Sequence, residues 1–244
     1  MPSRTPAALT RSDTLIIKYA SALIAVVYVL GAPPGVQAQN SVDVVEISKE
    51  LSRATPDLDA TTSVMWMPAE FWALMASMNG STAEDLAEIR ETLKPFNVFV
   101  ATDGTYGVFG GTKAKPASEI RASIRLVMET GKIVSPLDLD NVGSDMKSFV
   151  NSFIPAFLTE AVGDEADDYV TVVFPRETES GETIADPTSE GSFAIVIGER
   201  IFRWRTPIAG FVPPKYCPID GEAMSGAWKF CPWHGAELEE RPPE

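Results

Sequence analysis

Both cysteines and the only histidine of this 244-residue chain lie near its C-terminus, at Cys217, Cys231 and His234. The residues before Cys217 therefore contain no disulfide and no cysteine or histidine that could bind a metal. A chain of this length can bury a sizeable core, and its hydrophobic content of 45% is typical of globular proteins. We therefore expect the main part of the protein to be held together by packing alone.

The two cysteines begin two copies of one short pattern. Each cysteine follows an aromatic residue and precedes a proline, one variable residue, a potential metal ligand and a glycine, in the segments Tyr216–Gly221 and Phe230–Gly235. The potential ligands are Asp220 and His234. The glycine after each ligand suits a tight turn, because glycine adopts positive φ without strain.

This pair of motifs resembles the zinc-ribbon family over roughly residues 214–238, and over nothing upstream. Each knuckle in that family carries two ligands three positions apart. Here each knuckle keeps its first cysteine, and Asp220 or His234 stands where the second cysteine is usual. The resemblance implies one structural zinc ion held by Cys217, Asp220, Cys231 and His234, because four protein ligands leave no open position.

Three alternatives follow from the same residues: a disulfide, a redox motif at residues 231–234, and a decayed ribbon that holds no metal. In an oxidising compartment Cys217 and Cys231 could form a disulfide, and the motifs would then hold no metal. Trp228 and Trp233 flank the second motif, where they either cover the metal site and pack the module on the body or form an exposed aromatic patch for a partner. We favour packing for these two tryptophans.

The N-terminal residues predict export. A basic leader precedes an uncharged, largely apolar run at residues 19–32, which is too short to span a bilayer comfortably. Val36 and Ala38 are small residues of the kind that signal peptidase accepts. We expect a signal peptide at residues 1–38, no transmembrane helix in the mature chain and a periplasmic or extracellular location. An anchor that is not cleaved is the alternative.

Apolar residues at helical spacing predict a helical hairpin and one longer helix. The first helix of the hairpin starts at Pro68, and a capping box of Ser81 and Glu84 starts the second. The longer helix starts with Ser144 as its cap, and Pro155 should kink it because proline removes one helical hydrogen bond.

Alternating apolar residues predict antiparallel hairpins. Residues 96–101 and 105–109 flank Asp103 and Gly104, a dipeptide that suits a two-residue turn. Another hairpin turns at Gly198 and Glu199, with Phe202 and Trp204 facing inward. Further strands are expected at residues 124–128, 133–134 and 169–174, and a solvated acidic loop at residues 164–168. The expected fold class is α+β, with antiparallel β-hairpins packed against a helical hairpin and one kinked helix.

The chain divides into five segments by its composition and by the proline and glycine residues that mark their boundaries. These are the signal peptide at residues 1–38, a lead-in segment at 39–63 with one short helix at 46–53, the α+β body at 64–212, the zinc-ribbon-like module at 213–238 and a disordered tail at 239–244.

Charge and residue content limit the function. The net charge of −14 argues against a nucleic-acid partner, which would require a basic surface. Outside the terminal motifs the chain lacks histidine and cysteine, the residues on which acid–base and nucleophilic catalysis most often rely. Ser144 and Lys147 match a Ser-x-x-Lys pattern, but a helix cap and a solvated lysine explain it.

We expect a non-catalytic binding or assembly protein whose partner is a protein of the cell envelope. The alternative is an exported hydrolase or metal-dependent enzyme that uses the terminal site or a carboxylate-lined pocket.

Overall fold

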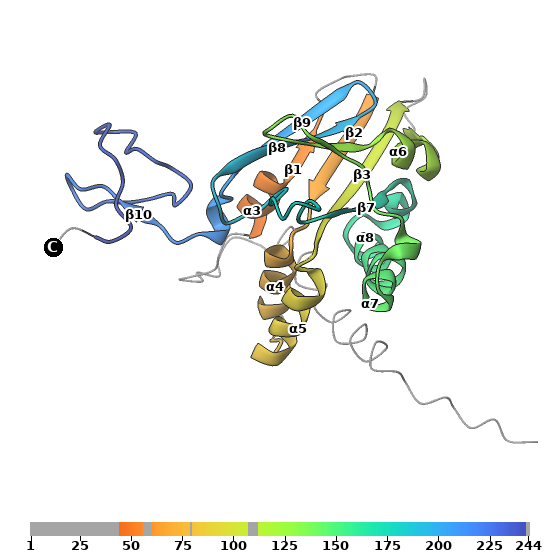
Figure 1. Ribbon diagram of the computed structural model, residues 1–244, viewed down its shortest axis with the longest axis horizontal. Coiled ribbons are helices and arrows are strands. Elements are labelled where there is room, and N and C mark those ends of the chain that lie inside the picture. The colour runs from red at the N-terminus through yellow and green to blue at the C-terminus, as the bar shows by residue number, and fades with distance from the viewer. Residues whose placement is uncertain (1–43, 56–59, 79, 107–111, 243–244) are drawn as a thin grey trace, which may run out of the picture.

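A computed structural model of the chain describes residues 44–55, 60–78, 80–106 and 112–242. The predicted signal peptide lies outside these ranges. The described residues form an α+β fold, as the sequence predicts, in which the strands pair antiparallel (Figure 1). Among these residues, no helix has both the length and the apolar character needed to cross a membrane.

The described residues form α-helices and β-strands that alternate along the chain. The α-helices are α3 (Val44–Leu51), α4 (Ala69–Met78), α5 (Ala83–Leu93), α6 (Ala117–Ser123), α7 (Ser144–Ser148) and α8 (Ile154–Val162). The strands are β1 (Ser52–Ala54), β2 (Ala60–Trp66), β3 (Phe96–Tyr106), β4 (Thr112–Ala114), β5 (Arg125–Met128), β6 (Ile133–Val134), β7 (Val170–Pro175), β8 (Gly191–Ile197), β9 (Arg200–Thr206), β10 (Lys215–Tyr216) and β11 (Ala223–Met224).

Two antiparallel sheets form the body. In the first sheet β1, β2 and β3 are neighbours in that order, and both β4 and β7 pair with β3; the second sheet has the order β6-β5-β8-β9. Aromatic rings join the two sheets: Trp66 and Phe99 of the first contact Phe193 and Trp204 of the second, with ring centroids 4.9–6.1 Å apart. One part of the core therefore lies between the sheets, on their alternating inward-facing residues. Another part comes from the helices, where Trp72 of α4 contacts the rings of Phe153 and Phe157.

Residues of α3 belong to the same core as both sheets. Val44, Ile47 and Leu51 are buried at spacings of three and four, which places them on one face of the helix. The indole Nε1 of Trp204 donates a hydrogen bond to the carbonyl of Leu51. The short helix expected at residues 46–53 is thus present two residues earlier, and it packs into the body.

The helical hairpin is confirmed, but its second helix starts one residue later than expected. Thr82 is the N-cap of α5, and its side chain and that of Asp85 each bond the other's backbone N–H. The N–H of Ser81 bonds the carbonyl of Ala76, so it is not available to the side chain of Glu84, as the expected capping box requires. The expected capping box of Ser81 and Glu84 was wrong for this reason.

The hairpin expected at Asp103 and Gly104 was also wrong. β3 runs without a break through both residues and pairs with β2, β4 and β7. Asp103 is buried and bonded on both sides of the strand, so it cannot lie in an exposed turn. A Cβ on Gly104 would lie 2.9 Å from the carbonyl oxygen of Lys113, so glycine allows β4 to approach closely.

The longer helix is interrupted just before Pro155, as its missing N–H predicts. α7 ends at Ser148, a π-helical turn spans Phe149–Phe153, and α8 has Pro155 in its first turn. Gly143 is the N-cap of α7, so the expectation that Ser144 is the cap was wrong by one residue. The acidic segment expected as a loop is a 3₁₀ helix at Gly163–Asp168.

The hairpin of β8 and β9 is confirmed in detail. Ile197 pairs with Arg200 across the turn, and Gly198 has a φ of 59°. Phe202 and Trp204 are buried while Arg203 and Arg205 are exposed, which gives this strand the alternation that the sequence indicated.

Candidate metal centre

The two Cys-containing motifs fold into two knuckles with the same backbone hydrogen bonds. In the first, the N–H of Gly221 bonds the carbonyl of Cys217, and the N–H of Cys217 bonds the carbonyl of Glu222. In the second, Gly235 and Cys231 make the equivalent pair, and Ala236 takes the place of Glu222. Gly221 and Gly235 have φ values of 73° and 65°, the positive values that the sequence predicts for these turns.

Each knuckle is also flanked by an antiparallel residue pair at the same positions relative to its cysteine. Tyr216 pairs with Ala223 across the first knuckle, and Phe230 pairs with Glu237 across the second. A further pairing of Tyr216 with Glu239 joins the first knuckle to the end of the chain. The two knuckles therefore form one small module, set beside the body in Figure 1.

The knuckles bring three potential ligands together. Cys217, Cys231 and His234 each contribute one ligand atom, and these atoms lie within 4.8 Å of one another. The Nδ1 of His234 is 3.3 Å from the sulfur of Cys217 and 3.5 Å from that of Cys231, and the sulfurs are 3.6 Å apart. Three of the four predicted site residues are thus close enough to bind one metal ion.

These distances are close to the edges of a tetrahedral coordination shell. With Zn–S bonds of about 2.3 Å and Zn–N bonds of about 2.0 Å, the S···S edge is about 3.8 Å and each S···N edge is about 3.5 Å. The three separations in this protein agree with those edges to about 0.2 Å. The backbone therefore places the sulfurs and the imidazole nitrogen where one small ion can contact all three.

Asp220, the fourth predicted ligand, lies at the edge of this group. Its Oδ2 is 3.7 Å from the Nδ1 of His234, and its Oδ1 accepts a hydrogen bond from the N–H of Glu222. That hydrogen bond is the largest cause that holds the pKa of Asp220 below its usual range. The carboxylate is therefore charged at neutral pH and has one oxygen directed towards the site.

Backbone N–H groups also act on the two thiols. Burial raises the pKa of Cys217, and the N–H groups two and three positions further on oppose this only in part. Burial acts in the same direction on Cys231, but the N–H groups of His234 and Trp233 and the side chains of Cys217 and His234 together lower its pKa. Cys231 therefore forms the thiolate, which is the form that binds metals, more readily than an ordinary cysteine does.

The disulfide that the sequence left open is not formed. Sulfurs 3.6 Å apart are well outside the bond length of about 2.05 Å in a disulfide, and both cysteines are free. Both sulfurs also lie within 3.5 Å of the Nδ1 of His234. Both sulfurs are also buried, so neither is placed to act as an accessible nucleophile.

The tips of the knuckles carry exposed hydrophobic side chains. Ile219 and Trp233 occupy the same position, two residues after each cysteine, and are 66% and 73% exposed. Phe230 and Trp228, which precede Cys231 in the chain, are 54% and 47% exposed. For Trp233 the expectation that it covers the site and packs the module on the body was wrong, because the turn of the knuckle buries the sulfur of Cys231 and leaves the side chain two residues later in solvent.

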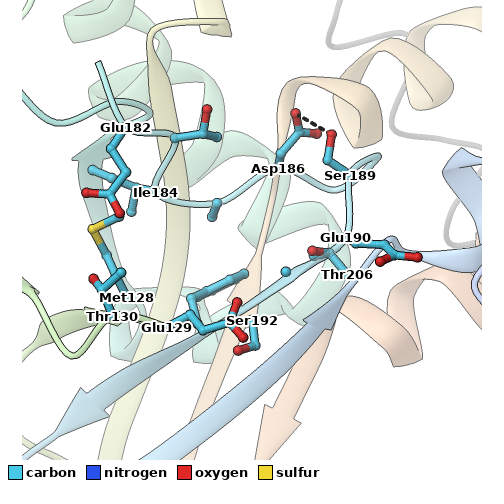
Figure 2. Close-up of a pocket in the computed structure, with 14 residues that line it drawn as sticks. Met128, Glu129, Thr130, Glu182, Ile184, Asp186, Ser189, Glu190, Ser192 and Thr206 are labelled. Carbon is cyan, nitrogen blue, oxygen red and sulfur yellow. Dashed lines mark hydrogen bonds between the residues drawn. The ribbon is translucent and has the colours of Figure 1, made fainter. Parts of the chain in front are cut away.

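A separate pocket on the body is lined by carboxylates, the kind of feature on which the enzyme alternative depends. Figure 2 shows Glu129, Glu182, Asp186 and Glu190 around a hollow of about 310 Å³ that also contacts Met128. Asp186 is already engaged: it pairs with Arg176 at 3.2 Å and accepts hydrogen bonds from Thr188 and Ser189. Its pKa is held down despite burial, chiefly by the bonds from Thr188.

The Ser-x-x-Lys pair is not arranged for catalysis. The ammonium of Lys147 lies 2.7 Å from a carboxylate oxygen of Asp140, and the hydroxyl of Ser144 bonds Asp145. Ser144 and Lys147 thus each bond an aspartate and not each other.

Sequence reasoning missed one feature of the body, a large apolar groove between the first sheet and the helices. Its residues come from α3, α4, α8 and three strands that are far apart in the chain, so no local pattern could reveal it. Comparisons of the chain with known protein families, with curated proteins and with solved structures gave no significant match.

Proposed function

We propose that residues 213–238 form a zinc module of the zinc-ribbon kind, and that the protein uses it to bind a protein of the cell envelope. Zinc is the ion that best suits two thiolates, one imidazole and one carboxylate in a tetrahedral site. Asp220 completes the coordination through its Oδ2. With four protein ligands the metal has a structural role and holds the two knuckles together.

The exposed knuckle tips are the observation that carries this proposal. Ile219, Trp228, Phe230 and Trp233 are four large hydrophobic side chains exposed within one small module. A surface of this kind is typical of a protein interface, where aromatic residues contribute most of the binding energy. One metal ion shared by the bases of both knuckles would fix these side chains in place, which lowers the entropy lost on binding.

The metal is tested by intact mass under native and denaturing conditions. The native mass should exceed the denatured mass by one zinc ion, and His234→Ala should remove the difference. An equal mass in both conditions would contradict the metal proposal. Trp233→Ala should keep the zinc, because this side chain points away from the site.

The partner is tested by affinity capture from an envelope extract. Trp233→Ala should abolish the capture of any specific protein that the wild type recovers. Ile133→Ala is a matched control, since Ile133 is an equally exposed hydrophobic residue on the body, at 66%. A role for the knuckle tips would be contradicted if both variants captured equally reduced amounts of the partner protein. It would also be contradicted if neither variant captured less than the wild type.

A further inference from the structure

The second sheet has an inner face against the first sheet and an outer face towards solvent. Phe193 of β8 and Trp204 of β9 lie on the inner face, where each contacts an aromatic ring of the first sheet. Side chains alternate along a strand, so their neighbours Ala194 and Arg203 point outward. The burial agrees with this, because Ala194 is half-buried and Arg203 is exposed.

Apolar and arginine side chains make up most of the outer face. Val196 of the central strand β8 is paired with Arg125 of β5 on one side and with Ile201 of β9 on the other. Val196 is half-buried and Ile201 is 50% exposed. The solvated face of an antiparallel sheet usually carries polar side chains, and exposed apolar residues beside arginine are instead typical of a protein interface.

The charged side chains of this face are all positive. Arg203 and Arg205 of β9 are exposed, and Arg125 is half-buried. None of the outward positions of β5, β8 and β9 carries a carboxylate, although the chain as a whole has a net charge of −14. Among the residues that the structure describes, none forms an ion pair with Arg203 or Arg205. Both guanidinium groups are therefore available to an anionic partner.

The order of side chains along β9 favours an extended partner. Ile201, Arg203 and Arg205 follow one another at every second position, so they form one row on the outer face. Neighbours in such a row lie about 7 Å apart. Alternate side chains of an extended peptide have the same spacing, so two carboxylates and one apolar side chain can each meet one member of the row.

We propose that the outer face of β9 binds an extended acidic segment of a partner protein. Two carboxylates of the segment pair with Arg203 and Arg205, and an apolar side chain contacts Ile201. A short segment is affected only by charges within a Debye length of about 8 Å, so the local positive charge outweighs the acidic remainder of the chain. An anionic membrane is too extended for this, because it also meets that acidic remainder.

This contact is separate from the metal module, with which it shares no residue. Each exposed ion pair contributes little, so the contact is weak and is measured at equilibrium. The test uses the full chain and a peptide in which one leucine and two glutamates alternate with serines, labelled with a neutral coumarin. Fluorescence anisotropy should show saturable binding that weakens as salt is added. An analogue with glutamine in place of glutamate should bind about tenfold more weakly.

Substitutions in the chain locate the binding face. Arg203→Gln and Arg205→Gln should each weaken binding of the glutamate peptide about threefold and leave binding of the glutamine analogue unchanged. Arg90→Gln is the matched control, since Arg90 is an exposed arginine on α5, and it should bind like the wild type. His234→Ala should also bind like the wild type, so failure of the metal proposal leaves this one standing.

Three results would overturn the proposal. These are the absence of saturable binding, equal affinity for the glutamate and glutamine peptides, and an equal loss of affinity in Arg90→Gln and Arg203→Gln. The comparison of the two peptides needs no substitution, so it remains informative if a variant fails to fold. Binding to anionic phospholipid vesicles without binding of the peptide would overturn the proposal as well.

Discussion

Asp103 connects the two sheets of the body through its side chain. Only 2% of this residue is exposed, and its carboxylate accepts a hydrogen bond of 2.7 Å from Thr62 on the neighbouring strand. It also lies 2.8 Å from the ammonium of Lys115 and 3.3 Å from the guanidinium of Arg200, which belongs to the second sheet. Burial alone would raise the pKa of Asp103, but these partners outweigh it and hold the pKa below its usual range.

We predict that Asp103→Asn makes the stability of the body less sensitive to acid. Because the folded protein lowers the pKa of Asp103, its contribution is complete above the unfolded pKa of about 4 and is lost as the pH falls through the folded value. The free energy of unfolding, measured by urea titration between pH 7 and pH 3, should therefore fall less steeply in the variant than in the wild type. Identical slopes would contradict this assignment.

The same substitution should also destabilise the protein at neutral pH. We expect a loss of about 2–3 kcal/mol, because removal of the charge of Asp103 takes a buried counter-charge from both Lys115 and Arg200. This value lies below the range for fully buried pairs, since Lys115 is 40% exposed and water screens part of its charge. Asp140→Asn is the matched control, because that carboxylate is exposed and should change stability very little.

At the scale of elements, we predict that the knuckles depend on the proposed metal more than on packing. The core of the module consists of Cys217, Met224, Cys231 and Leu238, and two of these residues are proposed ligands. So small a core does not stabilise a fold by itself. A zinc chelator at neutral pH should therefore increase amide hydrogen exchange in residues 213–242 and leave the rates in the sheets of the body unchanged. Unchanged exchange in the module after metal removal would contradict a structural role.

Gly226 gives a second prediction at this scale. A Cβ on this residue would lie 2.1 Å from the carbonyl oxygen of Pro213, so the backbone between module and body would have to shift. Gly226→Ala should weaken zinc binding about tenfold in competition with a chelator, which corresponds to overpacking by about 1.4 kcal/mol. Gly143→Ala should have no such effect, because no atom lies within 4 Å of a Cβ at that position.

At the scale of the whole molecule, the body and the module have separate cores. The main core contains residues from α3 to Ile208, and the core of the module shares none of them. Phe211 still packs against the main core, so the body extends at least to that residue. A chain that ends at Val212 should fold, with a thermal unfolding midpoint within a few degrees of the full-length protein when measured by circular dichroism. Loss of the cooperative transition would show that the body requires the module.

Much of the local structure could be predicted from the sequence because it depends on neighbours in the chain. The hairpin at Gly198, the helix interruption before Pro155 and the positive φ of Gly221 and Gly235 each follow from the properties of one residue. Asp103 and Gly104 were misjudged because the same dipeptide suits both an exposed turn and a buried strand crossing. Only the positions of Thr62, Lys115 and Arg200 distinguish the two cases.

The sequence by itself determined the fold class, and it singled out Cys217, Cys231 and His234, which the fold brings together. Both follow from hydrophobic periodicity and a repeated residue spacing, which are local properties of the chain. Tertiary structure decided the surroundings of the candidate site residues and the shape of the surface of the body. It separated the sulfurs beyond disulfide distance, turned Ile219 and Trp233 outward, and gathered residues of α3, α4 and α8 around one groove. Exposure and cavity shape depend on contacts between elements far apart in the chain, and a linear pattern does not record those contacts.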